Sequence, residues 1–357
     1  MVGLPYPVTI AQGSLDHLAE IVRAASPGAR VAIITDANVG PLYGERAATQ
    51  LGAGTSPLTM ASGERFKTRD TWASLTDQLL TLGFGRDTII VAIGGGVVGD
   101  IAGFVAATYM RGVSFVQVPT SLLAMVDASI GGKTGVDTPA GKNLVGAFHQ
   151  PAAVVIDPAV LNTLPAEHFR AGFAEILKHG VIADASYFDR ARAFAEHHAL
   201  DGREAVSELT ALIERSVAIK ASIVARDEKE AGLRKVLNFG HTIGHAIEAA
   251  SKYGLLHGHA VAIGMVFEAR IAERLGVAAA GTAQAVAEAC RAARLSTALP
   301  DVAAAVLLEF TRSDKKVRGG KAEYALPSRV GSMAGEGAGW AVLVEDTLVM
   351  EVLSNRA

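Results

Sequence analysis

Four histidines lie within one short stretch of the chain, "LNFGHTIGHAIEAASKYGLLHGHA", which covers residues 237 to 260. They are His241, His245, His257 and His259, and the whole chain has 10 histidines. His241 and His245 are four residues apart, so they share one face of a helix. This is the histidine spacing of the zinc-protease pattern H-E-x-x-H, but residue 242 is Thr where that pattern needs a general base. The histidines are therefore metal ligands, a proton shuttle or ordinary helix residues, but not a protease motif.

A carboxylate could complete a metal site with these imidazoles. In "GFAEILKHGVI" Glu175 lies inside an apolar helical pattern, and Lys178 follows one turn later. A buried Glu is rare unless it is paired or bound to a metal. Catalytic zinc commonly takes three protein ligands, so Glu175 with two of the four histidines is one interpretation. The alternative is a set of capping and core histidines beside a Glu175–Lys178 helix pair.

A glycine-rich turn follows a buried apolar strand in "IIVAIGGGVVGDIAGF". Gly94, Gly96 and Gly99 fit the pattern G-x-G-x-x-G, in which backbone N–H groups at a helix N-terminus bind a pyrophosphate. The acidic residue expected about 20 positions further on is missing, because Thr120 and Ser121 lie there. The alternative is a tight turn that only lets the helix pack closely on the sheet.

Polar residues also follow two other predicted strands. Asp36 and Asn38 come after the strand "RVAIITD", and Glu64 and Lys67 lie in "SGERFKTRD" after the next strand. The carboxyl ends of parallel strands meet at one edge of a sheet, which is where ligands bind. Each group alone could be a solvated loop, but together with the glycine turn they favour a nucleotide site at that edge.

The run "DASIGGKTGVDTPAGKNLVGAFHQP" carries Asp127, Lys133, Lys142 and Asn143 among glycines. We expect a loop here, and a loop of this length is costly to order unless it binds something. Ammonium groups beside the backbone N–H groups of glycines suit a phosphate. The alternative is a mobile surface loop.

The elements that must position these groups change in character along the chain. The first part alternates short apolar strands with amphipathic helices, which indicates a parallel sheet covered by helices. Later, long helical patterns dominate, at 167–182, 185–198, 202–225, 236–252, 258–275, 282–293 and 301–310, before short strands near the end. We expect an α/β nucleotide-binding domain over residues 1–163 and a mainly α-helical domain for metal and substrate over residues 164–357, with a cleft between them.

Composition excludes several classes of protein. The chain has 357 residues, of which 50% are hydrophobic and 19% charged, as in globular proteins with a large core. Its net charge of −3 provides no global field toward nucleic acid or an anionic membrane. One cysteine, Cys290, can form no disulfide within the chain, which fits a reducing cytoplasm. Because we find neither a signal-peptide pattern nor an apolar run long enough to span a membrane, we expect a cytoplasmic protein.

Longer motifs resemble one known family. They include "GGGVVGDIAGFVAATYMRG", "VPTSLLAMVDASIGGKTGVD", "GKNLVGAFHQP", "AEILKHGVI", "RDEKEAGLRKVLNFGHTIGHAIE" and "LHGHAVAIGM". In their order and length they resemble 3-dehydroquinate synthase, of the sugar-phosphate cyclase superfamily, from "TDANVGPLYG" to "DKK". The resemblance implies an NAD-binding α/β domain with a parallel sheet, a helical metal-binding domain, an active site between them, and usually a homodimer.

The resemblance also implies roles for particular residues. One divalent metal, zinc or cobalt, would be bound by Glu175, His241 and His257, which leaves His245 for substrate binding and proton transfer. The other implied catalytic residues are Lys133, Lys178, Lys220, Arg234 and Asn238. The other substrate-binding residues are Arg111, which in the family can come from the partner subunit, and Asp127, Asn143, Lys315 and Lys316. The implied NAD-binding residues are Asp36, Asn38, Ser62, Gly63, Glu64, Lys67, Gly95, Gly96, Val97, Val98, Gly99, Asp100, Thr120, Ser121, Lys133, Lys142 and Thr163.

The implied substrate is a phosphorylated sugar acid, 3-deoxy-D-arabino-heptulosonate 7-phosphate. A lyase reaction of the shikimate pathway, which leads to chorismate and the aromatic amino acids, would oxidise it transiently with NAD, eliminate phosphate, reduce it again and close the 3-dehydroquinate ring by an aldol step. Lys220 and Arg234 would hold the carboxylate, which favours this reaction over the carboxylate-free 2-deoxy-scyllo-inosose or valiolone type. A metal-dependent polyol dehydrogenase and a non-catalytic NAD-binding dimer are further alternatives. His259 stands where the family usually has Glu, in "HGEAV", so a second titratable group there would act on metal affinity.

Overall fold

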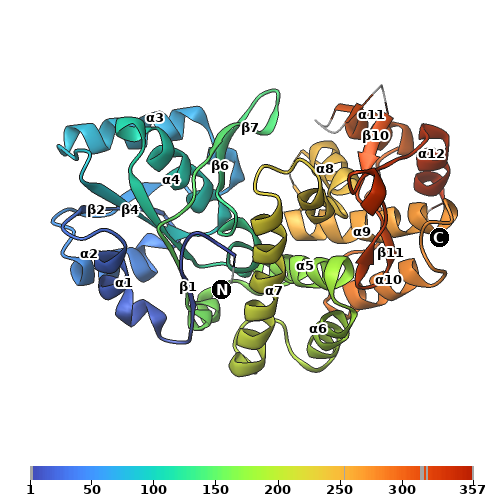
Figure 1. Cartoon of the computed structure of the whole chain (residues 1–357), viewed down its shortest axis with the longest axis horizontal. Helices are drawn as coiled ribbons and strands as arrows, with labels where there is room; N and C mark the ends of the chain where they lie inside the picture. Colours follow the sequence, from blue (N-terminus) through green and yellow to red (C-terminus); the bar gives the residue numbers. More distant parts are fainter. Residues whose placement is uncertain (1–2, 253, 314–316, 319–320, 356–357) are drawn as a thin grey trace. The chain divides into compact units, whose positions relative to one another are not determined.

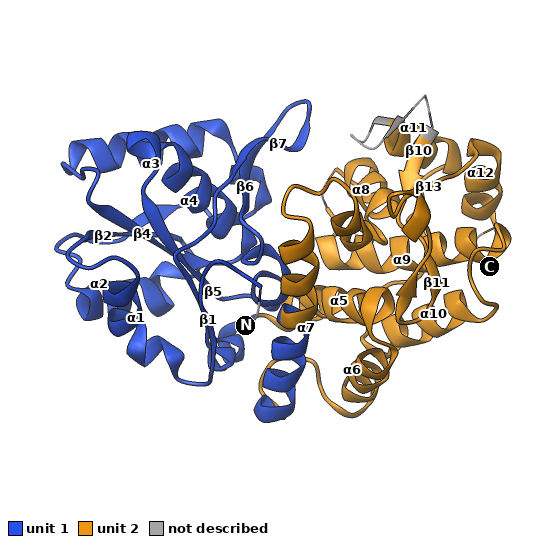
Figure 2. Ribbon diagram, viewed as in Figure 1, with its two compact units in different colours: residues 1–164, 206–217 blue, residues 165–205, 218–357 orange. Residues whose placement is uncertain are grey.

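The chain folds into two compact units (Figure 1). The structure is a computed structural model that describes residues 3–252, 254–313, 317–318 and 321–355. Unit 1 comprises Met1–Leu164 and Val206–Val217, and unit 2 comprises Pro165–Ala205 and Ala218–Ala357 (Figure 2). Lys315 and Lys316, which we predicted to bind substrate, lie outside the described residues.

Unit 1 is built on a six-stranded sheet whose described strand pairs are all parallel. This is the sheet that the alternation of strands and helices predicted, and its strand order is β1-β8-β5-β4-β2-β3. The strands are β1 Val8–Ile10, β2 Arg30–Asp36, β3 Leu58–Met60, β4 Thr88–Gly94, β5 Ser114–Pro119 and β8 Ala153–Ile156.

Helices cover both faces of this sheet. Along β4, Ile90 and Ala92 pack into one hydrophobic core, whereas Ile89 and Val91 pack into another. A parallel strand that is apolar on both faces needs such cover on each side. The helices α3 Arg69–Thr81 and α4 Gly96–Thr108 supply the first core, and α1 Leu18–Ala25 and α2 Glu45–Leu51 supply the second. Short helical turns are η1 Ser14–His17, η2 Gly40–Gly44, η3 Glu64–Phe66, η4 Tyr109–Arg111, η5 Ala124–Ala128 and η6 Pro158–Thr163.

Residues 133–148 form an antiparallel hairpin, and the loop that we predicted there is wrong. Its strands are β6 Lys133–Thr138 and β7 Gly141–Phe148. A Cβ atom on Gly146 would lie 2.1 Å from the Thr134 carbonyl oxygen, so this close strand pairing requires glycine. The hairpin therefore depends on close approach of the two backbones and not on an apolar alternation that a sequence reading could detect.

Unit 2 is mainly helical. A helix expected over 236–252 is divided, because Gly240 takes a left-handed φ of 80° and ends the turn before α8 begins at His241. The helices are α5 Ala166–Ala183, α6 Ala185–His197, α7 Val206–Arg226 (whose first part belongs to unit 1), η7 Leu233–Asn238, α8 His241–Ala250, α9 His257–Arg274, α10 Thr282–Ala292, α11 Ala304–Ser313, η8 Glu336–Ala338 and α12 Asp346–Ser354. Short strands form the sheets β13-β10-β9 and β11-β12, with β9 Val317–Arg318, β10 Lys321–Tyr324, β11 Pro327–Arg329, β12 Ser332–Met333 and β13 Val342–Leu343.

Candidate functional site

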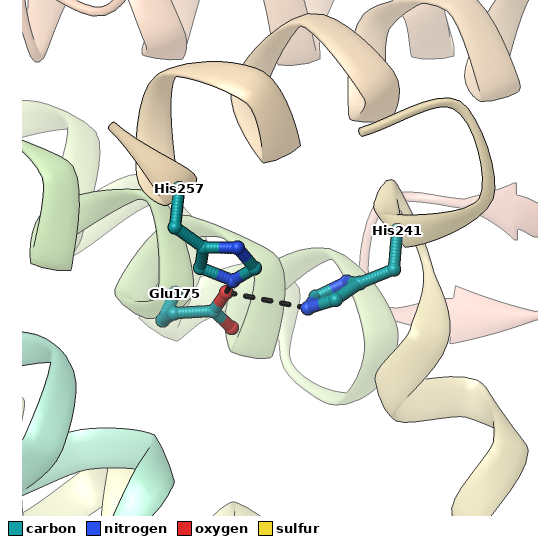
Figure 3. Close-up of side chains that lie close together, drawn as sticks. All are labelled: Glu175, His241 and His257. Atoms are coloured by element: carbon teal, nitrogen blue, oxygen red, sulfur yellow. Dashed lines mark ion pairs between the residues drawn. The ribbon is translucent and has the colours of Figure 1, made fainter. Parts of the chain in front are cut away.

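Three helices of unit 2 bring together one carboxylate and two imidazoles (Figure 3). Glu175 lies in α5, while His241 and His257 are the first residues of α8 and α9. The Glu175 Oε1 atom is 3.7 Å from His241 Nε2 and 3.6 Å from His257 Nε2. Only 1% of Glu175 is exposed. The side-chain atoms of all three residues therefore converge on one buried point.

The donor atoms of this cluster fit a divalent metal. His241 Nδ1 lies 3.1 Å from the Phe239 carbonyl oxygen, and His257 Nδ1 lies 3.2 Å from Glu248 Oε2. An Nδ1–H that donates to oxygen leaves the Nε2 lone pair for a metal. Two ligands on one zinc ion, each bound at about 2.0–2.2 Å, lie roughly 3.3 Å apart in tetrahedral geometry, close to the distances seen here. One oxygen and two nitrogen donors are also a usual catalytic zinc set.

Charge around the cluster makes its two imidazoles different. Burial lowers the pKa of His241 well below its usual value, and nearby Lys178 lowers it further, so this ring is neutral. Burial also opposes a charge on His257, but the Glu248 and Glu175 carboxylates outweigh it and raise the pKa of His257 to about 10. Lys178, itself 1% exposed, forms an ion pair with Glu175. The cluster thus joins a buried ion pair, Glu175 and Lys178, to two imidazoles whose side chains are 12% and 31% exposed.

A glycine lets the helices that carry the cluster approach closely. Gly258 follows His257, and a Cβ atom there would lie 1.8 Å from the carbonyl oxygen of Ala171. Ala171 lies one helical turn before Glu175 on α5, so this contact sets the separation of the two ligand-bearing helices. Any larger residue at 258 forces them apart.

Other predicted residues of unit 2 lie near the cluster or are held by an adjacent loop. The ring centroid of His245 is 5.3 Å from that of His241 and 6.2 Å from that of His257. Arg234 is 1% exposed, and its Nη1 donates to the Glu228 carbonyl oxygen at 2.5 Å. Lys220, on α7, is 6% exposed. Both side chains are therefore buried cations of the predicted substrate site.

Two acidic residues that were not among the predicted site residues bind the loop that carries Arg234 and Asn238. Asp227 accepts hydrogen bonds from the backbone N–H groups of Ala231, Gly232 and Arg234 at 2.9, 2.8 and 2.9 Å. Glu230 accepts one from Asn238 Nδ2 at 2.7 Å. The available signal was the charged run "RDEKE" at residues 226–230, which Ala231 separates from Gly232. This run shapes the loop that carries Arg234 and Asn238.

His259 does not join the cluster. It is two residues from His257 on α9, and residues at that spacing point to different sides of a helix. Its Nδ1 accepts a hydrogen bond from the Ser296 backbone N–H at 3.4 Å. Burial lowers the pKa of His259, and the Arg170 guanidinium lowers it further. A direct effect of His259 on a metal therefore has no support from its position.

In unit 1 a buried lysine joins two predicted groups. Lys67 Nζ donates to Asp100 Oδ2 at 2.5 Å and to Asn143 Oδ1 at 2.6 Å. Burial opposes the charge on Lys67, but Asp100 and Glu64 outweigh it and its pKa is raised. Lys142 also pairs with Glu64 at 3.2 Å. The β6–β7 hairpin and the polar strand ends thus form one charged network, although we had assigned Asn143 to substrate and Lys67 to cofactor.

The glycine turn has the packing role that we considered, and its phosphate-binding role stays a prediction. Gly95 precedes α4, whose first turn carries Val97 and Val98. A Cβ atom on Gly99 would lie 2.7 Å from Gln117 Oε1, so that glycine is required for packing. The Thr120 N–H donates to the Gly94 carbonyl at 2.9 Å, which places the end of β5 beside the turn. The open N-terminus of α4 can still receive a phosphate.

The remaining predicted residues of unit 1 are placed as follows. The Asp36 carboxylate accepts the N–H groups of Asn38 and Val39 at 2.8 and 3.0 Å, at the end of β2. The hydroxyl of Thr163 lies 2.8 Å from that of Tyr43. Ser62 and Gly63 precede η3, and Gly96 is the first residue of α4. Ser121 Oγ accepts a hydrogen bond from the Ala124 N–H, and Asp127 lies in η5. Lys133 is the first residue of β6, and Arg111 is the last residue of η4, with a φ of 69°.

Comparison with known proteins decides the family. The model described as 3-dehydroquinate synthase N-terminal matches residues 57–171, and the one described as 3-dehydroquinate synthase C-terminal matches residues 172–317. The chain belongs to the 3-dehydroquinate synthase family. A 3-dehydroquinate synthase of Caulobacter vibrioides is 48% identical over 337 residues, which cover 91% of this chain and 90% of that protein. One from a Synechococcus strain is 46% identical over 335 residues, with the same coverage.

Solved structures confirm the predicted fold class for this 3-dehydroquinate synthase family member. A 2-deoxy-scyllo-inosose synthase complexed with carbaglucose-6-phosphate, NAD⁺ and Co²⁺ is 28% identical, with a TM-score of 0.86 and coverage of 99% of this chain and 96% of that one. The 2-epi-5-epi-valiolone synthase of Streptomyces hygroscopicus with NAD⁺ and Zn²⁺ is also 28% identical, with a TM-score of 0.84 and coverage of 99% and 97%. A probable glycerol dehydrogenase of Sinorhizobium meliloti, 18% identical over 98% of this chain and 96% of that one with a TM-score of 0.68, shares the fold alone.

Proposed function

We propose that this chain converts 3-deoxy-D-arabino-heptulosonate 7-phosphate to 3-dehydroquinate and phosphate, as a lyase of the shikimate pathway. Membership of the 3-dehydroquinate synthase family carries this proposal, at 46–48% identity over nine-tenths of the chain. The burial of Lys220 and Arg234 supports it against carboxylate-free substrates, since an ammonium and a guanidinium group suit a substrate carboxylate.

The metal site of the enzyme consists of Glu175, His241 and His257. The convergence of their donor atoms and the bonds to both Nδ1 atoms support this assignment. A bound zinc or cobalt ion supplies Lewis acidity that lowers the pKa of a substrate hydroxyl. Glu248 keeps the His257 ring in the orientation that presents Nε2 to the metal.

The substrate is held by its two charged ends. Arg234 offers a planar guanidinium and Lys220 an ammonium to the carboxylate. Lys133, Asn143 and Arg111, with one of Lys315 and Lys316, bind the phosphate through charge-assisted bonds. Asp127, Lys178 and Asn238 orient the hydroxyl groups, and His245 exchanges protons with the substrate beside the metal cluster.

Unit 1 would hold NAD, which would supply a reversible hydride acceptor for the reaction. The glycine turn and the N-terminus of α4 receive its pyrophosphate. The carboxylates at the strand ends bind its ribose hydroxyls, and Lys67 supplies a positive charge beside Asp100. The full set is Asp36, Asn38, Ser62, Gly63, Glu64, Lys67, Gly95, Gly96, Val97, Val98, Gly99, Asp100, Thr120, Ser121, Lys133, Lys142 and Thr163.

The working form is a homodimer in the cytoplasm, in which Arg111 serves the site of the other copy. Exposed apolar side chains on β7 support an interface, because Leu144, Val145 and Phe148 are 40%, 38% and 49% exposed. The partner in catalysis is a small phosphorylated sugar acid, without nucleic acid or membrane. Among the described residues, no helix is both long and apolar enough to cross a bilayer.

A coupled assay tests the function. Metal-loaded protein receives NAD⁺ and 3-deoxy-D-arabino-heptulosonate 7-phosphate, and phosphate and dehydroquinate are measured together. We expect equal release of both, no accumulation of NADH, and loss of activity with a chelator. Accumulation of NADH would instead indicate a polyol dehydrogenase. Turnover of sedoheptulose 7-phosphate alone would indicate a carboxylate-free cyclase.

A further inference from the structure

One buried carboxylate lies beside the metal cluster without belonging to it. Glu268 is on α9, and its exposed fraction is 0%. Its Oε2 atom accepts a hydrogen bond from the Gly240 backbone N–H at 2.6 Å, and its Oε1 atom accepts one from the Ile243 N–H at 3.0 Å. Gly240 and Ile243 lie on either side of His241 in the chain. Both oxygens of Glu268 thus bind the backbone next to a proposed metal ligand.

These two bonds replace a helix cap that the sequence does not supply. The N-cap residue of α8 is Gly240, which has no side chain to bind the first N–H groups of the helix. Glu268 provides that cap from another helix, and its negative charge also faces the positive end of the α8 dipole. A buried carboxylate is costly unless it makes such bonds. An amide in its place has only one acceptor oxygen, so Gln could satisfy one N–H but not both.

The backbone around the cap leaves little room for adjustment. A Cβ atom on Gly264 would lie 1.9 Å from the Gly240 carbonyl oxygen, so α9 is in direct contact with the start of α8. Gly240 itself has a left-handed φ of 80°. Since His257 begins α9 and His241 begins α8, the cap connects the two helices that carry the imidazoles.

We propose that Glu268 is a positioning residue, which fixes the start of α8 so that His241 Nε2 meets Glu175 and His257 at metal-binding distance. This inference rests on the proposed function of the cluster as a metal site. The two bonds of Glu268 go to the backbone on each side of His241, so we place its effect on that backbone.

The same helix offers a matched control. Glu273 Oε1 accepts the Ala283 N–H at 3.0 Å and so caps α10, which carries none of the predicted site residues. Glu268→Gln and Glu273→Gln both neutralise a capping carboxylate on the same helix, but Gln can keep the single bond of Glu273 and only one of the two bonds of Glu268. Only the first changes a cap that precedes a metal ligand.

The test measures Co²⁺ binding, which needs neither substrate nor NAD. Affinity is obtained by competition with a chromophoric chelator, and the visible absorption of bound Co²⁺ reports its ligand geometry. We expect Glu268→Gln to weaken Co²⁺ affinity by about 10-fold or more and to change the absorption, as second-layer partners of metal ligands do. Glu273→Gln should match the wild type in both.

Two results would overturn the inference. One is a folded Glu268→Gln protein with wild-type Co²⁺ affinity and absorption, and the other is an equal loss in both variants. If Glu268→Gln does not fold, Glu268→Asp keeps the charge with a shorter reach, and wild-type Co²⁺ binding by that variant would also overturn it. A wild-type protein that binds no Co²⁺ and makes no dehydroquinate would instead refute the proposed function, on which the inference rests.

Discussion

Replacing Gly258 with alanine should separate the ligand-bearing helices α5 and α9. The added Cβ atom would lie 1.8 Å from the Ala171 carbonyl oxygen, whereas ordinary contact begins at 3.4 Å. The Ala171 carbonyl oxygen is a backbone atom and the added Cβ atom is attached directly to the backbone, so no flexible side chain can move aside. Relief requires the helices to part by roughly 1.5 Å at this point, as packed interiors have no spare volume.

This displacement is large compared with the dimensions of the metal cluster. The present distance of 3.6 Å between His257 Nε2 and Glu175 Oε1 would increase to roughly 5 Å. Two atoms bound to one ion at about 2.0–2.2 Å can be no more than ~4.4 Å apart. The variant should therefore lose one of its three ligands. Overpacking should cost about 3 kcal/mol, offset by about 1 kcal/mol from the better helix propensity of alanine.

The assay is zinc affinity by chelator competition, with thermal unfolding measured in the presence and absence of zinc. We expect Gly258→Ala to bind zinc at least about 100-fold more weakly and to lose most of the stabilisation that zinc provides. Gly337→Ala is the control, because a Cβ atom there meets nothing within 4 Å. Zinc affinity of Gly258→Ala within threefold of the wild type would refute the argument that this glycine sets the helix separation.

Three further predictions concern charged residues outside the metal cluster. Arg234→Ala should lower kcat/KM by about 100-fold or more because it removes the proposed buried partner of the substrate carboxylate. Fluorescence titration should find NAD⁺ affinity unchanged. An equal loss of NAD⁺ affinity would contradict the assignment of Arg234 to the carboxylate. Asp227→Asn should lower the free energy of unfolding by about 0.5–1.5 kcal/mol at pH 7, because the carboxylate is only partly buried. Burial opposes the Asp227 charge, but three backbone N–H bonds outweigh it and lower the pKa of Asp227. The stability that Asp227 contributes is therefore complete above the unfolded pKa of about 3.9 and is lost as pH falls through the lower folded pKa. Denaturation at several pH values should show the stability difference between variant and wild type shrinking below about pH 4, and a constant difference would exclude this cause. Lys67→Met should weaken NAD⁺ binding about 10-fold in calorimetric titration, because Asp100 and Asn143 lose their shared cation. Unchanged binding would show that NAD does not bind beside Lys67.

Most of the fold could be predicted from hydrophobic periodicity. The strands β2, β4 and β5 are short apolar runs between helical patterns, and their parallel pairing follows from that alternation. The β6–β7 hairpin could not be predicted in this way. It pairs Gly135 with Gly146 through close backbone approach, and its polar composition gives no alternation.

The candidate site was only partly accessible to sequence reasoning. Spacing showed that Glu175 and two histidines could bind a metal, but it left open which two. In the structure the starts of α8 and α9 place His241 and His257 against Glu175, which supports the proposed set of ligands. Glu248, Asp227 and Glu268 were missed because their partners are imidazole or backbone groups that no local pattern identifies.

The sequence separation of the three proposed metal ligands has a consequence for how the protein would acquire an ion. Glu175 is separated from His241 and His257 by many tens of residues and by whole helices. An unfolded chain would have to close these long loops around the ion, at a large entropic cost and with no nearby pair of ligands to start from. In zinc fingers the ligands are adjacent and the ion drives folding. Here the close packing of α5, α8 and α9 must come first, so the ion enters a protein that is already folded. On this account the metal site is complete before any ion binds, so metal binding would follow folding and would not drive it.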